Sequence, residues 1–410
     1  MSGKIAVVGA GPSGCYLAQA LLKAQPDLEL DVIDALPVPY GLVRYGVAAD
    51  HQGTKAVARQ FARVFERQGA RFFGNVAVGR DIALDELRDA YDVVVLAAGL
   101  AGDRRLGIPG DDLPCIHGAG TLTRALYEHP DAEALPAIGS RPLIVGNGNV
   151  AIDLLRLLAK APDELDGTDL GPGPSDWLAR SGIGEITIVG RSPAAQAKFD
   201  PVMIKELHKL GGVTIRVVGA GETDDPEGRK RLDALAAIDG HQSGPLLITF
   251  RFGLTPVAVE GSDGGAMVRF ASSAGEETVE CSSVLTAIGF RAAGDLPRDE
   301  MIAAAGEGGT GRLAPGLYAA GWFNRGPRGT IPENRADAQA LADLILADLS
   351  ARPAKPGRAV LERHAGVVDY EGWQRIDAAE IAAAAQGRCR AKISDRSELL
   401  RLAGDKEAGK

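Results

Sequence analysis

Residues 4–18 read KIAVVGAGPSGCYLA, an apolar run followed by three spaced glycines and a second apolar run. The run at residues 5–8 ends at Gly9, and Gly11 and Gly14 complete a G-x-G-x-x-G spacing. This order predicts a strand, a glycine turn and a helix. In such a turn the first glycine allows a tight bend, the second lets the backbone approach a pyrophosphate, and the third lets helix and strand pack closely. The unpaired N–H groups at the helix start then face the phosphates.

An acidic residue stands where this motif needs one. A second predicted strand at residues 30–33 ends in Asp34, which follows the turn by about 20 residues, the place of the acid that holds ribose hydroxyls. The glycine spacing alone is weak support for a nucleotide site. The strand before it, the helix after it and the acid at the next strand end together predict a dinucleotide-binding fold.

A second glycine turn occurs in the middle of the chain. Residues 143–145 form an apolar run, residues 146–151 read GNGNVA, and a helical pattern follows at residues 152–160. Ala151 replaces the third glycine, a variant that the motif allows. The next predicted strand, residues 185–189, ends in Gly190-Arg191-Ser192. The expected fold class is therefore α/β, with two Rossmann-like dinucleotide-binding domains.

Composition narrows the class of protein. The chain has 410 residues, of which 45% are hydrophobic and 24% charged, and a net charge of −9, which argues against nucleic-acid binding. No apolar run reaches the ~18–20 residues of a membrane span. The four cysteines form no C-x-x-C pair, so we expect no redox dithiol, no metal bound by this chain and a cytoplasmic location. They are Cys15, Cys115, Cys281 and Cys389.

Two nucleotide folds in one chain suggest that electrons pass between two cofactors. The first fold has a long loop at residues 35–51 after its acid and suits a permanently held FAD; the second suits an exchangeable NAD(P). At the end of the second strand of that unit, a 2′-phosphate needs a positive partner and a ribose hydroxyl needs an acid. Arg191 stands there with no acid beside it, which favours NADP(H).

The remaining pattern predicts the other elements. We expect helices at residues 55–68, 84–88 and 201–210, the last capped by Asp200, and strands at residues 71–78 and 91–98. The runs VTIRVV, LLITFRFG, AMVRFA and VLTAIG between residues 213 and 288 are expected to complete the second sheet. These are followed by a strand at residues 317–320, a long helix that ends at residue 349, a linker at residues 351–356 and a helical tail. A basic stripe is expected on the first of these helices, formed by Lys55, Arg59, Arg63 and Arg67.

Together these segments resemble the adrenodoxin-reductase-like ferredoxin–NADP reductases. The matching segments run from residue 5 to about residue 335, with a similar tail. They read IAVVGAGPSG, PVPYGLVRYGVAADH, NVAVGRDI, GNGNVAID, IVGRSPAAQAKF with KEL, GWFNRGPRGTI and WQRIDAAEI. The resemblance implies an FAD domain formed by residues 1–105 and 316–410, into which an NADP domain, residues 106–315, is inserted.

The resemblance also implies roles for individual residues. FAD contacts fall on the glycine turn, on Ser13, Asp34, Leu42 and Val78, and on Trp322, Gly329, Thr330 and Ile331 along the flavin. NADP contacts fall on Asn147, Gly148, Asn149, Val150, Arg191, Glu206 and Gly329. The pair beside the nicotinamide, with a catalytic role in orientation and proton handling, is His51 and Glu206.

The activity implied is transfer of a hydride from NADPH to FAD and of single electrons from FAD to an iron–sulfur ferredoxin. A basic cluster at Arg229, Lys230 and Arg231 matches a ferredoxin-docking run of relatives, although a solvated helix face is the alternative reading.

One departure leaves the nicotinamide cofactor open. Relatives usually carry a second arginine where this chain has Ser192. We still expect Ser192 among the cofactor contacts, because its hydroxyl can donate a hydrogen bond to phosphate, but it supplies no charge. Loss of one charge-assisted contact costs about 1.5–3 kcal/mol, or roughly 10- to 100-fold in affinity. An NADH-preferring reductase is therefore an alternative, with Lys198 as a candidate replacement for the missing charge. A pyridine nucleotide–disulfide oxidoreductase, disfavoured by the absent C-x-x-C, and a non-catalytic NADP(H) sensor are the others.

Overall fold

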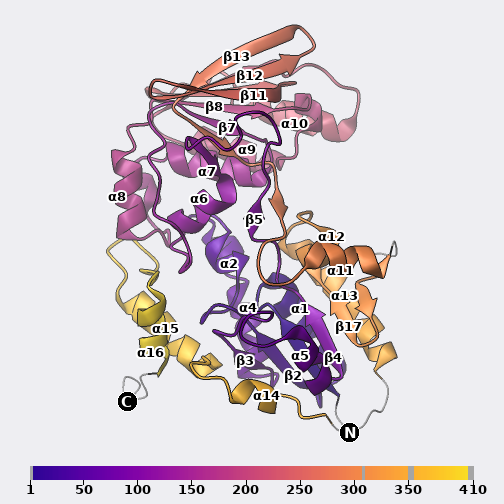
Figure 1. Ribbon diagram of the computed structural model, residues 1–410. Helices are drawn as coiled ribbons and strands as arrows, with labels where there is room; N and C mark the ends of the chain where they lie inside the picture. Colours follow the sequence, from indigo (N-terminus) through magenta and orange to yellow (C-terminus); the bar gives the residue numbers. More distant parts are fainter. Residues whose placement is uncertain (1–2, 307–309, 350–354, 405–410) are drawn as a thin grey trace. The chain divides into compact units, whose positions relative to one another are not determined.

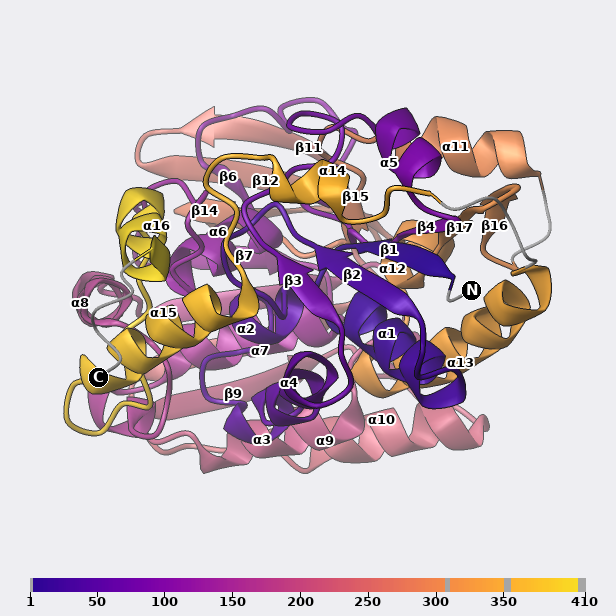
Figure 2. The same ribbon diagram turned by 90° about the horizontal axis from the view of Figure 1, so that it is seen from below.

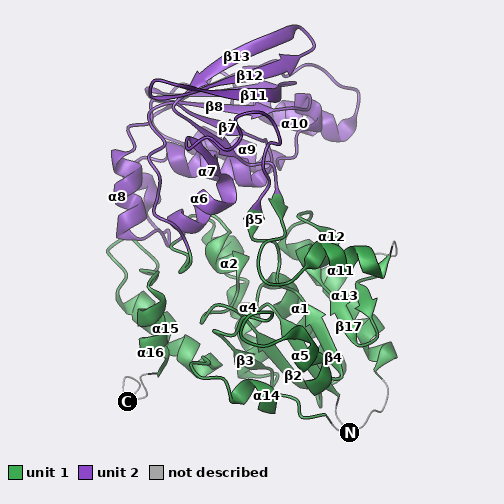
Figure 3. Cartoon of the chain, in the orientation of Figure 1, with its two compact units in different colours: residues 1–102, 128–131, 290–410 green, residues 103–127, 132–289 purple. Residues whose placement is uncertain are grey.

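The computed structural model describes residues 3–306, 310–349 and 355–404. Over these residues the chain forms two compact units, which Figure 3 colours separately. Unit 1 comprises Met1–Gly102, Glu128–Asp131 and Phe290–Lys410, and unit 2 comprises Asp103–Tyr127 and Ala132–Gly289. Each unit has its own parallel sheet with helices around it, in agreement with the expected fold class.

Unit 1 is organised around a sheet that, in the described part of the chain, has six strands (Figure 1). All neighbours are parallel except the edge strand β16, which is antiparallel to β17. The strands in spatial order are β16 (Arg312–Ala314), β17 (Leu317–Ala319), β4 (Val93–Leu96), β1 (Lys4–Val8), β2 (Glu29–Ile33) and β3 (Arg71–Phe73).

The central strand β1 explains why its sequence is continuously apolar. Ile5 and Val7 belong to the hydrophobic core on one face of the sheet, whereas Ala6 and Val8 belong to the core on the other. Side chains alternate between the two faces of a strand, so a strand covered on both faces has no polar position. The register places Val7 opposite Val32 and Val95.

The helices of unit 1 cover this sheet. Figure 2 shows α1 (Pro12–Ala24) and α13 (Ile331–Asp348) side by side, where Leu17, Leu21, Leu341 and Ile345 share one core. The other helices are α2 (Leu42–Tyr45), α3 (Gln52–Lys55), α4 (Ala58–Glu66), α5 (Leu84–Ala90), α11 (Arg298–Ala305), α12 (Gly321–Arg325), α14 (Ala359–Glu362), α15 (Tyr370–Ala382) and α16 (Arg396–Gly404).

Unit 2 has a second sheet whose six described strands are all parallel. In spatial order they are β6 (Ile116–Gly118), β14 (Ser283–Thr286), β7 (Pro142–Val145), β8 (Glu185–Gly190), β10 (Leu246–Phe252) and β9 (Val213–Val218). Its helices are α6 (Ala119–Leu126), α7 (Asn149–Ala159), α8 (Pro172–Arg180), α9 (Pro201–Glu206) and α10 (Pro226–Ala236), with short 3-10 turns η1 (Pro162–Leu165), η2 (Ala194–Gln196) and η3 (Leu207–Lys209).

A separate antiparallel sheet corrects one expectation. The run AMVRFA was expected in the second parallel sheet, but it forms the middle strand of β11 (Thr255–Ser262), β12 (Gly265–Ser272) and β13 (Gly275–Cys281). Ala266, Val268 and Phe270 alternate with exposed residues and pack into the core of unit 2. The alternation predicts a strand correctly but does not say which sheet the strand joins.

The basic stripe at residues 55–67 is also corrected. The helix is interrupted at residues 56–57, between α3 and α4, and Lys55 is buried with its Nζ atom 3.4 Å from the carbonyl oxygen of Arg44. Arg59, Arg63 and Arg67 remain exposed. The stripe therefore has three members, because Lys55 turns inward to satisfy the last carbonyl groups of α2.

Other expected elements are shorter in the structure. The strand expected at residues 71–78 ends at Phe73, and the helix expected at residues 201–210 continues as η3 after Glu206. Asp200 is its N-cap as expected, since its side chain accepts the N–H of Val202 at 2.8 Å. Most of the linker expected at residues 351–356 lies outside the described residues.

The limits of the units differ from the expected domain boundaries at 105/106 and 315/316. The chain passes between units at the short strands β5 (Gly102–Asp103) and β15 (Phe290–Arg291), and also on either side of Glu128–Asp131, which belong to unit 1. Residues 290–315, expected in the NADP domain, belong to unit 1. The reason is local pairing: β16 hydrogen-bonds to β17, and Met301 and Ile302 of α11 pack against the core of unit 1.

Candidate functional site

The glycine turn of unit 1 has the close packing that its spacing predicts. Gly9 has φ +112°, and a Cβ atom there would lie 2.5 Å from the carbonyl oxygen of Ala97. A Cβ atom on Gly14 would lie 1.9 Å from the carbonyl oxygen of Gly9, so helix α1 could not approach the strand this closely with any other residue. Gly11 faces open space and begins α1, which leaves its backbone accessible to a phosphate.

Asp34 at the end of β2 is tied to this turn. Its Oδ2 atom accepts the N–H of Ala10 at 2.8 Å, and its Oδ1 atom accepts the N–H of Leu36 at 2.9 Å. Burial raises the pKa of the Asp34 carboxyl to about 6, although these two hydrogen bonds oppose the rise. The carboxylate thus fixes the turn, and each oxygen keeps a further lone pair with which to accept a ribose hydroxyl.

A buried asparagine that the sequence reasoning did not single out connects three parts of this site. Asn334 of α13 accepts hydrogen bonds at Oδ1 from Ser13 at 2.9 Å and from Arg325 at 2.9 Å, and its Nδ2 atom donates to the carbonyl oxygen of Thr330 at 3.1 Å. Gly321 leaves room for Ser13, because a Cβ atom there would lie 1.8 Å from Ser13 Oγ. The starts of α1, α12 and α13 therefore meet around Asn334.

The segment that the sequence predicts along the flavin, from Trp322 to Ile331, is held by contacts of its own. Trp322 of α12 stacks on Phe290 with ring centroids 5.5 Å apart. Gly329 has φ +82°, and Thr330 caps α13 through a reciprocal pair of bonds with Glu333. Ile331 is the first residue of α13. The main chain of this turn is held by Arg325, whose Nε atom donates to the carbonyl oxygen of Arg328 at 2.8 Å.

The other predicted residues of unit 1 are more dispersed. Leu42 begins α2, and its side chain is accessible at 39% exposure. Val78 is buried and forms an isolated bridge with Ile82. His51 precedes α3, where its backbone N–H donates to Ala48. Val78 belongs to the same hydrophobic cluster as Val8, the residue that precedes Gly9 of the glycine turn.

The glycine turn of unit 2 repeats the geometry of the first. Gly146 has φ +123°, and a Cβ atom there would lie 2.2 Å from the carbonyl oxygen of Ala287. Gly148 begins α7, whose first residues are Asn149 and Val150. Asn147 lies over Gly190, where a Cβ atom would come 2.0 Å from Asn147 Nδ2. That amide is buried without a hydrogen-bond partner among the described residues, which is what an amide awaiting a ligand would show.

Two positive side chains flank this turn. Arg191 follows β8, and Lys198 has its Cβ atom 3.9 Å from the position of a Cβ on Gly148. Asn149 holds the second segment in place by accepting the N–H of Asp200 at 2.8 Å. Among the described residues, Arg191 and Lys198 are exposed and have no carboxylate partner. Ser192 is half-buried, and its carbonyl oxygen accepts the N–H of Gly253 at 3.2 Å.

Glu206 is oriented by an arginine that sequence reasoning missed. Arg156 of α7 is 4% exposed, and its Nη1 atom is 3.0 Å from Glu206 Oε2, while its Nη2 atom is 2.8 Å from Asp153 Oδ1. The helix that begins at the glycine turn therefore fixes the carboxylate of Glu206. His51 and Glu206 belong to different units, and their pairing stays a prediction.

The basic cluster on α10 is less uniform than its sequence. Arg231 donates from Nη1 to the carbonyl oxygen of Ala195 at 3.2 Å, and Lys230 pairs with Glu227 at 2.6 Å. Arg229 is exposed, with a carboxylate oxygen of Asp224 3.9 Å away. Arg229 and Lys230 are thus the exposed members of the cluster, and each lies beside a carboxylate.

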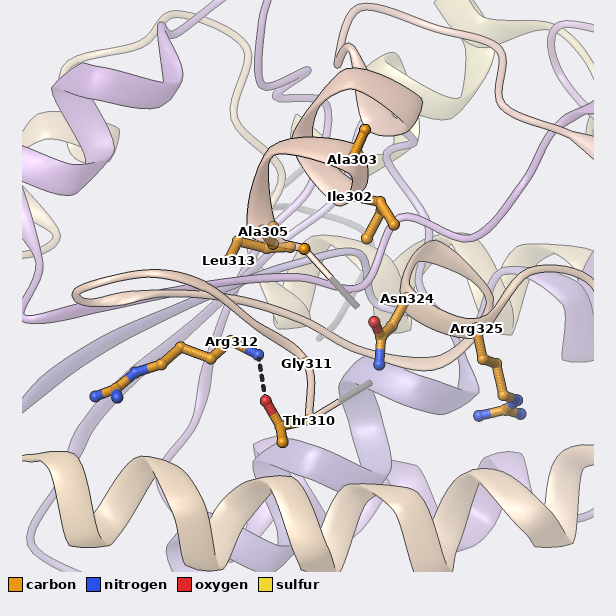
Figure 4. A pocket seen from close by; sticks show the side chains of 10 residues that line it. Ile302, Ala303, Ala305, Thr310, Gly311, Arg312, Leu313, Asn324 and Arg325 are labelled. Carbon is orange, nitrogen blue, oxygen red and sulfur yellow. Dashed lines mark hydrogen bonds between the residues drawn. The ribbon is translucent and has the colours of Figure 1, made fainter. Parts of the chain in front are cut away.

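A cavity of about 430 Å³ lies in unit 1 between α11, β16 and α12 (Figure 4). Ile302 and Leu313 form an apolar wall, and Asn324 and Arg325 contribute polar groups. No residue predicted for either cofactor lines it. In the described ranges no helix is long and apolar enough to cross a membrane, and no three metal-ligating side chains gather.

Comparison with known proteins shows which family the chain belongs to. The family model of the pyridine nucleotide-disulphide oxidoreductases matches residues 3–227, more than half of the sequence. The chain belongs to this family. The absent C-x-x-C weighs against a disulfide substrate but not against membership, because the matched residues include both glycine turns.

Full-length relatives narrow the assignment to the ferredoxin reductases of this family. The chain is 42% identical to a cindoxin reductase of Citrobacter braakii, over 97% of this chain and 91% of the relative. It is 34% identical to the NADPH-ferredoxin reductase FprA of Mycobacterium tuberculosis, over 97% and 98%. A solved structure of Mycobacterium tuberculosis FprA in complex with NADPH superimposes with a TM-score of 0.89 at 34% identity, over 98% of this chain and 100% of that one. The resemblance to adrenodoxin-reductase-like ferredoxin–NADP reductases and the fold class are confirmed.

Proposed function

We propose that this ferredoxin–NADP reductase holds FAD in unit 1 and NADPH in unit 2. The enzyme class and the use of NADPH follow from its relatives, which are named NADPH-ferredoxin reductases, and FAD is the flavin that the family resemblance implies. The observation that carries the placement is the pair of matching turns. Gly9 and Gly146 each have a positive φ and follow a central parallel strand, and the N-cap residues of α1 and α7, Gly11 and Gly148, come two residues later.

The two sites fit their cofactors on different grounds. In unit 1, the open backbone at Gly11, the acid Asp34 and the Trp322 segment suit a dinucleotide that carries a large aromatic ring. In unit 2, the buried amide of Asn147 and the unpaired cations Arg191 and Lys198 suit a phosphorylated nicotinamide dinucleotide.

The chain's residues position the reactants, since the redox chemistry resides in the cofactors. When bound, FAD accepts a hydride from the reduced nicotinamide and releases single electrons to a one-electron acceptor. Arg156 presents the Glu206 carboxylate in one orientation, and we assign Glu206 and His51 to orienting the nicotinamide and exchanging the proton at flavin N5.

Lys198 is the residue that we assign to the charge missing at Ser192. It follows Arg191 in the sequence and lies beside Gly148 of the turn, where its segment is held by Asn149. Two separated cations can neutralise a 2′-phosphate as two adjacent arginines do, although lysine acts as a point charge.

Anaerobic stopped-flow absorbance of the FAD-loaded protein tests this function. NADPH should bleach the flavin at low concentration, and Lys198→Ala should raise the NADPH concentration needed by about 10-fold while leaving the NADH response unchanged. Lys209→Ala, an exposed lysine on η3, is the control.

The other outcomes separate the alternatives. Equal bleaching by NADH would mean that Ser192 has relaxed the specificity. No bleaching by either nucleotide would contradict the enzyme and favour a nucleotide sensor.

The partner is a ferredoxin, since relatives are named for it. We place its docking at the Arg229, Lys230 and Arg231 cluster on α10. Its exposed members are Arg229 and Lys230, and an acidic partner would compete for them with Asp224 and Glu227.

A further inference from the structure

Residues 40–45 lie against the glycine turn of unit 1 in a strained conformation. Tyr40 has φ +82° and Gly41 has φ +44°, and a Cβ atom on Gly41 would lie 3.1 Å from the Cα atom of Gly11. The N–H of Tyr40 donates to the carbonyl oxygen of Ala10 at 2.9 Å. A tyrosine with positive φ is costly, so the surroundings must hold it in place.

Helix α15, more than 300 residues further along the chain, supplies that hold at Tyr40. The hydroxyl oxygens of Tyr40 and Tyr370 are 2.8 Å apart. The Tyr40 ring also meets the Trp373 ring edge-on, with centroids 5.9 Å apart. Both rings are at least 94% buried, so this contact lies within the core and not on its rim.

Arg44 connects the same segment to the same helix. Its guanidinium carbon lies 5.1 Å from the centre of the Trp373 ring and 5.0 Å from that of Tyr45, and its Nη2 atom forms an ion pair with Glu380. Arg44 is 6% exposed and Glu380 is fully buried. An arginine beside a glycine turn is usually taken as a phosphate ligand, but here its charge is neutralised by the carboxylate of α15.

Glu380 is itself held firmly. Its Oε1 atom accepts the N–H of Ile393 at 3.0 Å, and its Oε2 atom is 3.2 Å from Arg390 Nη1. Removing one member of a buried pair is strongly destabilising, because the other charge is left without compensation. Moving residues 40–45 away from α15 would break the Arg44–Glu380 pair, so this pair holds the segment in place.

We propose that Tyr370, Trp373 and Glu380 form a clamp on α15 that holds residues 40–45 against the glycine turn and so raises the affinity for FAD. Arg44, Tyr370 and Glu380 are then positioning residues for the cofactor, without touching it. The inference rests on the proposed placement of FAD in unit 1.

The test compares Glu380→Gln with Glu371→Gln, an exposed glutamate on the same helix. Titration of the apoprotein by flavin fluorescence should give a dissociation constant for FAD that is raised about 10-fold or more in Glu380→Gln and unchanged in Glu371→Gln. Amide hydrogen exchange at residues 40–46 of the apoprotein should accelerate, while NADP⁺ affinity stays at the wild-type value. A purely structural role would not confine the change to these amides.

Two further variants keep the proposal testable if Glu380→Gln does not fold. Tyr370→Phe removes one hydroxyl and should raise the dissociation constant about 3- to 10-fold. Glu380→Asp keeps the charge and should restore most of the affinity. Wild-type FAD affinity and exchange in both Glu380→Gln and Tyr370→Phe would overturn the clamp. A wild-type protein that binds no FAD would instead overturn the proposed function.

Discussion

Asp31 is a fully buried aspartate on β2, and its environment makes stability depend on pH. The Tyr91 hydroxyl donates to its Oδ2 atom at 2.8 Å, and Arg358 Nη2 lies 3.1 Å from its Oδ1 atom. Burial outweighs both partners and raises the pKa of Asp31 from 3.8 to about 6. The native state therefore holds this proton more tightly than the unfolded chain does.

The sign of the effect follows from linkage. As pH rises from about 4 to 6, ionisation of Asp31 costs the native state on the order of 3 kcal/mol, so the free energy of unfolding should fall across this window. Asp31→Asn should flatten the fall in part, because Asp34 has a pKa raised to about 6 and contributes with the same sign. Urea unfolding followed by circular dichroism at pH 4, 5, 6 and 7 measures how the free energy of unfolding changes with pH. Asp89→Asn, an exposed aspartate on α5, is the control, and an unchanged slope in Asp31→Asn would contradict the assignment.

Single residues also show what the sequence could and could not predict. Gly9, Gly14 and Asp34 were predicted because their roles depend on neighbours within one strand–turn–helix unit. Asn334 and Arg156 were missed because their roles depend on folding. Asn334 meets Ser13, 321 positions away, and Arg156 meets Glu206, 50 positions away. No local pattern marks such a residue.

Elements were predicted well where a periodic pattern and its end signal coincide, as at β1 and at α9 with its cap Asp200. They were assigned wrongly where a pattern gives the element but not its partner. The alternation in β12 identifies a strand, yet only the hairpins that flank it place it in the separate antiparallel sheet.

Helix α10 allows the docking proposal to be tested at the level of one element. Asp225 caps the helix by accepting the N–H of Gly228 at 2.6 Å, so charge reversal further along it should leave the helix intact. The double change Arg229→Glu and Lys230→Glu should slow ferredoxin reduction by about 10-fold at low salt, with the difference shrinking as salt rises. Stopped-flow reduction of ferredoxin and of a small dye would be compared. Arg180→Glu on α8 is the control, and equal loss with both acceptors would exclude docking at α10.

At the scale of the molecule, each unit has its own sheet, core and glycine turn, so the same substitution can be made in both units and its effects on the two cofactors compared. Gly9 and Gly146 hold equivalent positions, since a Cβ atom would lie 2.5 Å from a carbonyl oxygen at the first and 2.2 Å at the second. Gly9→Ala should remove FAD and leave NADP⁺ binding unchanged, whereas Gly146→Ala should do the reverse. Flavin absorbance of the purified protein and calorimetry with NADP⁺ measure the two sites.

The controls for this pair are Gly53→Ala and Gly184→Ala, because a Cβ atom at either position meets nothing within 4 Å. If Gly9→Ala abolished both ligands, the assignment of one cofactor to each unit would be wrong.

The order of strands in the first sheet has a consequence for how this protein is made. β17, at residues 317–319, lies beside β4, and α15, at residues 370–382, packs on residues 40–45. Unit 2, by contrast, draws its residues from Asp103–Tyr127 and Ala132–Gly289. On the ribosome, unit 2 can therefore finish folding while the first strands still wait for their neighbours, and the nascent chain carries an unfilled sheet edge through most of translation. With FAD placed in unit 1 as proposed, its site is complete only after α15 has been synthesised.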